Sequence, residues 1–523
     1  MQRGALFTYL FAGILFSTFF PLSKATAQSF FIGENNVAGG SLSDHAFSVV
    51  ATPDGGYLMA GHSDGEFNGF VSKGGYDAIV SKYNASGNHQ WTRNYGGSQY
   101  DFSEKIIATQ DGNFAVVGFT QSSNGDIPDN NGAMDIWVFK IDPAGQLLWS
   151  YTYGGPGNEG PNELLETPTG ELIIVGQTRS GKGDFSDIGG NYGNFDGWLL
   201  KLNANGLLLW EQNYGGTEED YIMDVLVSAN GYVCFGSTPS HDFDLTSNHG
   251  DWDYWLFEID TAGQSLWHQH YGGSGPEYSN SMVATATGYF LAGSTFSDDV
   301  DISLNRGGAD WWLVSTDFSG NLISEVSYGG SANESVSDLQ LNGAGTHHYI
   351  VGHTYSADGD ILTNRGNFDL WMLAIDGNGN VNANATFGSS DNDIAQALGC
   401  GLHGKDWVLA ESKVQAGDVP EAFGEIDQWW FAVNLAPTAL LEAKDKPDWQ
   451  LFPNPVQSEQ TLSIKGLDPS VTTVYLVDLL GRRQPLSRSI TGDFSLPETA
   501  PGSYWIEVNE SSHHAVLPLQ IAP

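Results

Sequence analysis

The chain contains a sevenfold repeat with a period of 57 to 61 residues. Each unit is marked by an aromatic residue followed by Gly-Gly or Gly-Ser. Six clear copies begin at Tyr95, Tyr153, Tyr214, Tyr271, Tyr328 and Phe387, and a weaker copy is Ala38-Gly39-Gly40. A fixed period of this length is typical of stacked or radial arrays of small structural units rather than of one globular core.

Each unit contains four short runs rich in Val, Ile, Tyr, Phe and Trp. In the second unit these runs are 101–108, 114–119, 135–139 and 147–151. Runs of this kind, separated by Asp, Asn and Gly, predict β-strands joined by tight turns. No segment shows a convincing 3.6-residue apolar period. The pattern predicts an all-β protein in which residues 28–437 form a seven-bladed β-propeller.

The two ends of the repeat predict that the ring closes. The seventh unit ends after its third run, 429–433, so its fourth strand is missing. Residues 29–33 precede the first unit at the place where a fourth strand would lie. We therefore expect residues 29–33 to complete the last blade, which removes exposed sheet edges.

The repeat resembles the SBBP β-propeller repeat of secreted bacterial proteins. The matching residues are Trp149-Ser150-Tyr151-Thr152-Tyr153-Gly154-Gly155, the Asp111-Gly112-Asn113 turn and the Gly118-Phe119-Thr120 strand end. The resemblance covers residues 29–436 and implies a propeller. Because that family has no common enzymatic activity, the resemblance implies no reaction.

The N-terminal segment predicts secretion. Arg3 is followed by an apolar stretch over 5–20 and by the small residues Ala25-Thr26-Ala27. This order is typical of a signal peptide, here residues 1–27, cleaved before Gln28. The stretch is short for a membrane span, so we expect no transmembrane segment after cleavage.

Residues 438–448 are expected to be a linker, and the composition changes after it. Residues 449–523 resemble the C-terminal sorting domain of type IX secretion cargo in Bacteroidetes. The matching segments are Leu451-Phe452-Pro453-Asn454-Pro455, 474–482 and 496–508. The resemblance implies a small C-terminal β-sandwich, recognition by the type IX machinery, and release from or attachment to the outer cell surface.

The formal net charge of −42 falls almost entirely on residues 28–437. Such a surface repels phosphate backbones, which excludes nucleic acid as a partner. The two cysteines, Cys234 and Cys400, lie three units apart. Pairing needs Cα atoms within about 7 Å, so we expect two buried thiols.

An aspartate precedes the third strand of every unit. These residues are Asp77, Asp135, Asp196, Asp253, Asp310, Asp369 and Asp427. An aspartate entering a strand can accept backbone N–H bonds and fix a turn. Because a catalytic site is rarely repeated seven times, we interpret these residues as structural.

The long connections before these aspartates contain a second acidic group. Its members are Asp126, Asp184, Asp242, Asp244, Asp299, Asp301 and Asp360. Carboxylates beside glycine turns suit hard cations such as Ca²⁺, and loops of this length are usually functional or disordered. Calcium loops and solvated turns both stay open, and no other cofactor is indicated.

The aromatic residues fall into a repeated group and a non-repeated group. Tryptophans that recur on third and fourth strands are expected to pack between blades. The non-repeated Trp311, Trp430 and Tyr254 are the better candidates for contact with sugars.

No catalytic motif stands out. The sequence lacks the Ser-x-Asp-x-Gly-x-Thr-Trp box of sialidase-like propellers, a nucleophile elbow and a phosphate-binding loop. We expect a secreted or cell-surface binding protein, not an enzyme, with a glycan or a surface protein as ligand. The alternatives are an extracellular enzyme acting on polysaccharide and a structural matrix component. Carboxylates clustered at the channel on two blades alone would favour the enzyme, and repeat-equivalent lining would favour a binder or scaffold.

Overall fold

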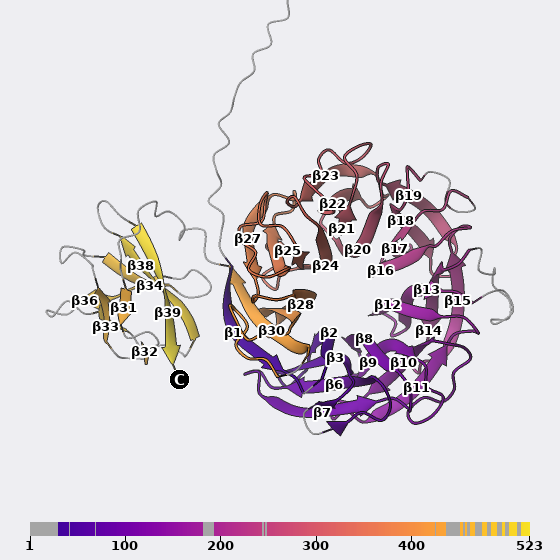
Figure 1. The fold of residues 1–523 in the computed structure, drawn as a ribbon, viewed down its shortest axis with the longest axis horizontal. Coiled ribbons are helices and arrows are strands. Elements are labelled where there is room, and N and C mark those ends of the chain that lie inside the picture. Colours follow the sequence, from indigo (N-terminus) through magenta and orange to yellow (C-terminus); the bar gives the residue numbers. More distant parts are fainter. Residues whose placement is uncertain are drawn as a thin grey trace, which may run out of the picture.

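The computed structural model contains seven four-stranded antiparallel sheets arranged radially as a propeller (Figure 1). It describes residues 30–435 apart from 41, 68–69, 181–192, 243–244, 246–247 and 424. In the C-terminal segment it describes the strands between 450 and 522 with Leu486 and Leu496. The described residues contain no helix, so none could cross a membrane as a helix. The predicted all-β fold and the seven blades are confirmed.

The strands run in sequence order from the channel outward in blades one to six. Blade one contains β2 (Asp44–Ala51), β3 (Tyr57–Ser63), β6 (Asp77–Tyr83) and β7 (His89–Tyr95), with the small hairpin β4 (Glu66–Phe67) and β5 (Phe70–Val71) in its long connection. Blade two contains β8 (Asp101–Ala108), β9 (Phe114–Thr120), β10 (Asp135–Ile141) and β11 (Leu147–Tyr153). Blade three contains β12 (Glu159–Glu166), β13 (Leu172–Thr178), β14 (Asp196–Leu202) and β15 (Leu208–Tyr214).

The remaining blades repeat this order. Blade four contains β16 (Tyr221–Val227), β17 (Gly231–Thr238), β18 (Asp253–Asp260) and β19 (Ser265–Tyr271). Blade five contains β20 (Glu277–Ala284), β21 (Gly288–Thr295), β22 (Asp310–Asp317) and β23 (Leu322–Tyr328). Blade six contains β24 (Glu334–Leu341), β25 (His348–Thr354), β26 (Asp369–Ile375) and β27 (Val381–Phe387). Blade seven contains β28 (Asp393–Leu402), β29 (Lys405–Ser412), β30 (Asp427–Leu435) and β1 (Phe30–Ala38).

The outer strand of blade seven comes from the start of the propeller. Strand β1 pairs antiparallel with β30, giving the sheet order β1-β30-β29-β28. The strand extends to Ala38, five residues beyond the segment 29–33 marked by the sequence. Ala38 lies opposite Gln428, as Tyr153 lies opposite Ile136 in blade two. Ala38 therefore occupies the position of the aromatic residue that marks every other unit.

The core lies between neighbouring blades. One apolar cluster, for example, joins Val117 and Val138 of blade two to Leu164, Ile174 and Leu200 of blade three. Large rings fill these wedges because they bury the most apolar area per residue. The recurring third-strand tryptophans are fully buried, as expected: Trp137, Trp198, Trp255, Trp312, Trp371 and Trp429.

The three candidate sugar contacts are also in this core, so that prediction is wrong. Trp311 is 1% exposed, Trp430 is 2% exposed and Tyr254 is 0% exposed. The reason is local, because each ring packs on an aromatic residue of the same or a neighbouring blade. Trp311 lies 4.1 Å from Trp371 and Tyr254 lies 4.7 Å from Trp312, centroid to centroid.

The repeated tyrosines connect neighbouring blades. In five junctions the hydroxyl donates a hydrogen bond to a glycine carbonyl in the turn between the third and fourth strands of the following blade. The pairs are Tyr95 with Gly145, Tyr153 with Gly206, Tyr214 with Gly263, Tyr271 with Gly320, and Tyr328 with Gly379. The turn glycines have positive φ, 76° at Gly145 for example, which glycine adopts without strain.

The C-terminal segment forms two sheets of its own. One has the order β31-β33-β37-β36 and the other β32-β39-β38-β34-β35. Their bounds are β31 (Gln450–Phe452), β32 (Val456–Gln457), β33 (Thr461–Lys465), β34 (Thr473–Val477), β35 (Arg483–Pro485), β36 (Ser487–Arg488), β37 (Phe494–Ser495), β38 (Gly502–Asn509) and β39 (His514–Ala522). The predicted signal peptide and linker lie outside the described residues.

The two cysteines are free thiols. Cys234 is fully buried, and burial raises the pKa of its thiol. Cys400 is partly buried rather than fully buried as expected, because it lies near the end of the long strand β28.

Candidate functional site in the central channel

The first strand of each blade carries a β-bulge at the same repeat position, facing the channel. The bulged residues, here called the bulge ring, are Phe47, Glu104, Asn162, Met223, Asn280, Ser337 and Gln396. The residues that follow them, here called the polar ring, are Ser48, Lys105, Glu163, Asp224, Ser281, Asp338 and Ala397. Bulges are often found where a strand must re-aim a side chain, and here they aim two rings of side chains at one space.

Two cavities meet at the polar ring. One has a volume of about 190 Å³ and is lined by the bulge ring and much of the polar ring. The other has a volume of about 380 Å³ and reaches apolar residues further along the first strands, such as Leu165 and Val283. Lys105, Glu163 and Asp224 line both cavities. We call the level of the polar ring, where the two cavities meet, the waist of the channel.

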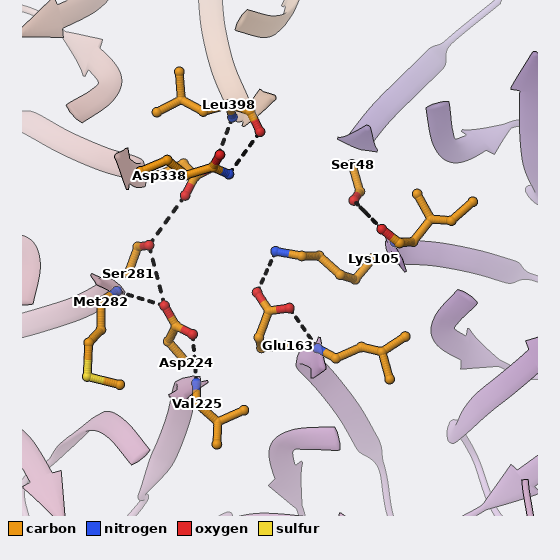
Figure 2. A network of polar contacts seen from close by, with 12 residues as sticks. Ser48, Lys105, Glu163, Asp224, Val225, Ser281, Met282, Asp338 and Leu398 are labelled. Atoms are coloured by element: carbon orange, nitrogen blue, oxygen red, sulfur yellow. Dashed lines mark hydrogen bonds and ion pairs between the residues drawn. The ribbon is translucent and has the colours of Figure 1, made fainter. Parts of the chain in front are cut away.

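An ion pair spans two blades at this waist (Figure 2). Lys105 Nζ lies 2.5 Å from Glu163 Oε2. The side chains of Lys105 and Glu163 are 31% and 17% exposed. The second carboxylate oxygen of Glu163 accepts the backbone N–H of Leu164 at 2.8 Å.

On the opposite side of the waist, Ser281 connects two aspartates (Figure 2). Its hydroxyl lies 3.4 Å from Asp224 Oδ2 and 3.3 Å from Asp338 Oδ1. Both aspartates also accept a backbone N–H from the following blade. Met282 N donates to Asp224 at 2.7 Å, and Leu398 N donates to Asp338 at 2.8 Å. These bonds join neighbouring blades at their inner edges, so the ring has a structural role as well.

Burial makes two channel carboxyl groups unusually basic. Burial, with repulsion from Glu163, raises the pKa of Asp224 to about 8. Burial raises the pKa of Glu104 in the bulge ring to about 7, against the attraction of His45. Burial opposes charging of Lys105, but the neighbouring carboxylates, Glu163 foremost, outweigh it and raise its pKa. Near neutral pH the channel thus contains proton-donating carboxyl groups and one ammonium group.

The polar ring combines repeat-equivalent positions with different side chains. Blades three, four and six contribute carboxylates, blade two contributes lysine, and the others contribute serine or alanine. The sequence analysis distinguished a cluster of carboxylates on two blades from a channel lined by repeat-equivalent residues. The polar ring has features of both, because its residues occupy equivalent positions but differ in chemistry. It offers hydrogen bonds of several kinds to a polar ligand.

The seven aspartates are the first residues of the third strands and lie away from the channel waist. Each is at most 1% exposed. Asp77 and Asp310, for example, each accept the backbone N–H four residues earlier at 2.8 Å, from Lys73 and Arg306. These aspartates lie beside the paired glycines of the repeat markers, and their position explains why no larger residue fits there. A Cβ on Gly154 would lie 2.4 Å from Asp135 Oδ1.

The acidic loop residues contact the same glycine-rich turns. Asp126, Asp301 and Asp360 each accept the N–H of the first glycine of a repeat marker, at 3.1 to 3.2 Å. Asp242 and Asp299 accept N–H groups two residues further along. Asp184 and Asp244 lie outside the described residues.

Several of these loop carboxylates also have cationic partners. Lys73 Nζ lies 2.8 Å from Asp126, and Arg306 Nη2 lies 3.3 Å from Asp360. Among the described residues, no group of three or more His, Cys, Asp and Glu is arranged to hold a metal ion. Each of the described loop carboxylates accepts at least one hydrogen bond from a backbone N–H group.

Sequence reasoning did not single out the channel residues. Each polar-ring residue lies four positions after an acidic residue that begins or directly precedes the first strand, as Lys105 follows Asp101 and Asp224 follows Asp220. Aligning the seven units on that acid would have shown one column of changing polar residues. The signal was present, but a search for repeated residues overlooks a position whose identity varies.

Comparisons with known proteins assign no family to this chain. No protein-family model matches the chain. The regulatory protein FlaEY of Caulobacter vibrioides is 25% identical over 215 residues, which are 37% of this chain and 22% of FlaEY. The chain thus spans less than a quarter of that relative.

Three solved structures are similar at low identity. The hemagglutinin-neuraminidase ectodomain of parainfluenza virus 5 is 11% identical with a TM-score of 0.39, covering 78% of this chain and 87% of that chain. A DUF4221 protein of Bacteroides vulgatus is 9% identical with a TM-score of 0.34, covering 79% and 99%. A Synechocystis apocarotenoid oxygenase is 10% identical with a TM-score of 0.39, covering 73% and 87%. At these TM-scores the likenesses carry no argument about function.

Proposed function

We propose that this protein is a secreted binding protein that holds a polar, ammonium-bearing group of a glycan in its central channel. One observation carries the proposal. Residues that fix the fold repeat from blade to blade, whereas the polar ring does not, although its seven members occupy equivalent positions. The bonds to the next blade explain a hydrogen-bond acceptor at this place, but they do not explain why lysine, two kinds of carboxylate and serine all occur there.

Charge supports an ammonium group as the preferred ligand chemistry. Glu163 and Asp338 contribute carboxylates to the channel, Glu104 and Asp224 contribute carboxyl groups of raised pKa, and Lys105 is the one cationic member of the two rings. The surrounding propeller is strongly acidic, and a negatively charged cleft concentrates cationic ligands. Amides of the bulge ring, such as Asn162, supply further partners for sugar hydroxyls. A lysine side chain of a surface protein is the other candidate for this place.

Export is part of the proposal. The signal-like residues 1–27 and the segment 449–523, which resembles type IX sorting domains, support secretion to the outer cell surface. The type IX machinery would then be the partner of the C-terminal segment. Deleting residues 449–523 is expected to abolish extracellular accumulation, and unchanged extracellular levels would contradict this part.

The experiment for binding is retention of the full-length protein on a panel of immobilised polysaccharides, with Ca²⁺ or with EDTA. The proposal expects retention on polymers with free amino groups and weaker retention of the Glu163→Gln/Asp224→Asn variant. Retention that needs Ca²⁺ would instead support cation binding in the acidic loops. Retention of neither protein on any polymer would contradict a glycan ligand and favour a surface protein.

A polysaccharide-acting enzyme is the second candidate, favoured by the raised pKa values of Glu104 and Asp224 beside other channel carboxylates. Glycoside hydrolysis uses one protonated and one ionised carboxyl group. This candidate expects hydrolysis of a polysaccharide by the wild-type protein and its loss in Glu104→Gln. Binding without hydrolysis would exclude it.

A further inference from the structure

Five aromatic side chains form a continuous row over blades three to five, here called the aromatic row. They are Phe195, Tyr221, Trp252, Tyr278 and Phe296. The centroids of neighbouring rings lie 5.4 to 6.2 Å apart along the whole row. The row therefore crosses two blade junctions without a gap.

The strand directions place the aromatic row on one face of the propeller. Phe195 and Trp252 come just before third strands, and Tyr221 and Tyr278 lie at the starts of first strands. Phe296 comes just after a second strand. In an antiparallel blade the first and third strands begin at the end where the second strand finishes. The five side chains therefore share the face on which the long connections lie.

The rings of the row are accessible at the surface. Tyr278 is 45% exposed and Phe296 is 44% exposed, and the other three rings are half-buried. Contiguous exposed apolar side chains often mark an interaction site, and Tyr, Trp and Phe are enriched in the centres of protein interfaces.

Packing of the blades does not require rings at these positions. The junction between blades five and six carries Ala309 and Ser335 at the equivalent repeat positions, and the junction between blades two and three carries Met134 and Gly160. The row thus ends on both sides at junctions that have the same strand arrangement without aromatic residues. This difference favours a role for the row at the surface rather than in the fold.

Acidic residues flank the row. Glu218, Asp251 and Asp298 are exposed, and each lies within three residues of one of the rings in sequence. The propeller as a whole is strongly acidic. A surface of this charge attracts cationic partners, and the faces of aromatic rings attract ammonium and guanidinium groups.

The protein's own contacts favour a guanidinium group. At the blade-three end of the row, Arg179 Cζ lies 5.6 Å from the centroid of Phe195, and its Nη2 donates to Asn194 Oδ1 at 3.3 Å. A guanidinium group is flat and stacks on rings, unlike the compact ammonium group of lysine.

The tilts of the rings favour a flexible polypeptide over a polysaccharide. From Tyr221 to Phe296 the successive interplanar angles are 14°, 45° and 88°. Separate guanidinium groups on long side chains can follow these tilts, whereas the linked rings of a straight polysaccharide stack best on faces that share one plane.

We propose that the aromatic row is a docking surface for an arginine-containing basic segment of a partner polypeptide. The guanidinium groups of the segment lie on the exposed rings, and the flanking carboxylates pair with their charge. No residue of the row lines either channel cavity, so the inference stands whether or not the channel binds a ligand.

The test uses two labelled peptides, one of four Gly-Arg units and one of four Gly-Lys units, whose binding to the full-length protein is measured by fluorescence anisotropy at about 150 mM NaCl. The wild type should bind the arginine peptide at least about fivefold more tightly than the lysine peptide. Trp252→Ala/Tyr278→Ala should reduce this preference to less than about twofold, because charge alone then attracts both peptides.

Two control variants should keep the preference for arginine. Phe318 is 51% exposed but lies in the turn between the third and fourth strands of blade five, on the opposite face, so Phe318→Ala removes an exposed ring outside the row. The channel variant Glu163→Gln/Asp224→Asn should also keep it, which separates failure of this inference from failure of the proposed function.

Four outcomes would overturn the inference. They are equal affinity of the wild type for the two peptides, no binding of either peptide at millimolar concentration, a preference that survives in Trp252→Ala/Tyr278→Ala, and displacement of the arginine peptide by cellohexaose, which would assign the row to a saccharide. If the double variant does not fold, Tyr278→Ala and Phe296→Ala, which remove the most exposed rings of the row, decide the matter with the same peptides.

Discussion

Lys105 of β8 and Glu163 of β12 form an ion pair between neighbouring blades at the central channel, with Nζ 2.5 Å from Oε2. Lys105→Met would leave Glu163 beside Asp224 with no compensating cation. Because the pair is half-buried, we expect a loss of about 1–3 kcal/mol in the free energy of unfolding at pH 8. The loss should be smaller at pH 5, where Asp224, with its pKa of about 8, carries a proton.

Urea unfolding at the two pH values measures this difference. The double variant Lys105→Met/Glu163→Gln is the control, and it should recover part of the loss because it removes the unpaired charge. An equal loss at pH 5 and pH 8 would contradict the charge argument.

The tyrosine bonds between blades make a second prediction. Tyr95→Phe removes only the hydroxyl that donates to Gly145 O at 2.8 Å. We expect a loss of about 1 kcal/mol in the free energy of unfolding, the usual value for one buried hydrogen bond. Tyr100→Phe, at a position 46% exposed, is the control and should change nothing measurable in the same denaturation experiment. Equal effects would show that the interblade bond contributes no stability.

The glycine of the repeat marker makes a third prediction. In Gly154→Ala the new Cβ would lie 2.4 Å from Asp135 Oδ1, closer than non-bonded atoms approach. We expect a destabilisation of about 1–3 kcal/mol from the forced shift. Gly377→Ala is the control, because its Cβ would have no heavy atom within 4 Å. Calorimetric melting of both variants checks this, and equal melting temperatures would contradict the steric reason for the glycine.

Buried carboxyl groups predict an unusual dependence of stability on pH. Burial raises the pKa of Asp44, Asp135 and Asp310 to about 6 and that of Asp253 to about 7. Between pH 4 and these values the folded chain binds protons that the unfolded chain has lost. Protons therefore stabilise the folded state, and stability should fall as the pH rises from about 4 to about 7.

Melting temperatures at pH 5 and pH 8 measure this dependence. Asp135→Asn removes one of the titrating groups while keeping an acceptor for the N–H of Asn131. Its melting temperature should therefore change less with pH than that of the wild type. A wild-type protein that is more stable at pH 8 than at pH 5 would be contrary to this account.

The fold could be predicted because the sequence pattern of one blade occurs seven times. The tyrosine markers, the turn glycines and the aspartates before third strands recur for reasons of packing and turn geometry that act identically in each blade. Ala38 could be recognised as a weak marker, but the spacing does not show that the Asn36 side chain lies against the turn glycine Gly87 at this junction, where a Cβ would be 3.2 Å from Asn36 Oδ1. That is a property of packing in three dimensions, not of spacing.

The channel was harder to predict for a related reason. Glu163, Asp224 and Asp338 lie more than fifty residues apart in sequence, and only closure of the ring brings them to one waist. The burial of Trp311 and Tyr254 shows the same limit, because non-repetition alone did not indicate exposure.

The most direct test of the central claim is titration of the full-length protein with two oligosaccharides of equal length, one of glucosamine and one of N-acetylglucosamine. The account predicts that the amino form binds more tightly at pH 7, and that Glu163→Gln/Asp224→Asn weakens its binding at least about tenfold. Binding of the amino form that this channel variant leaves unchanged would contradict the claim that the polar ring is the binding site.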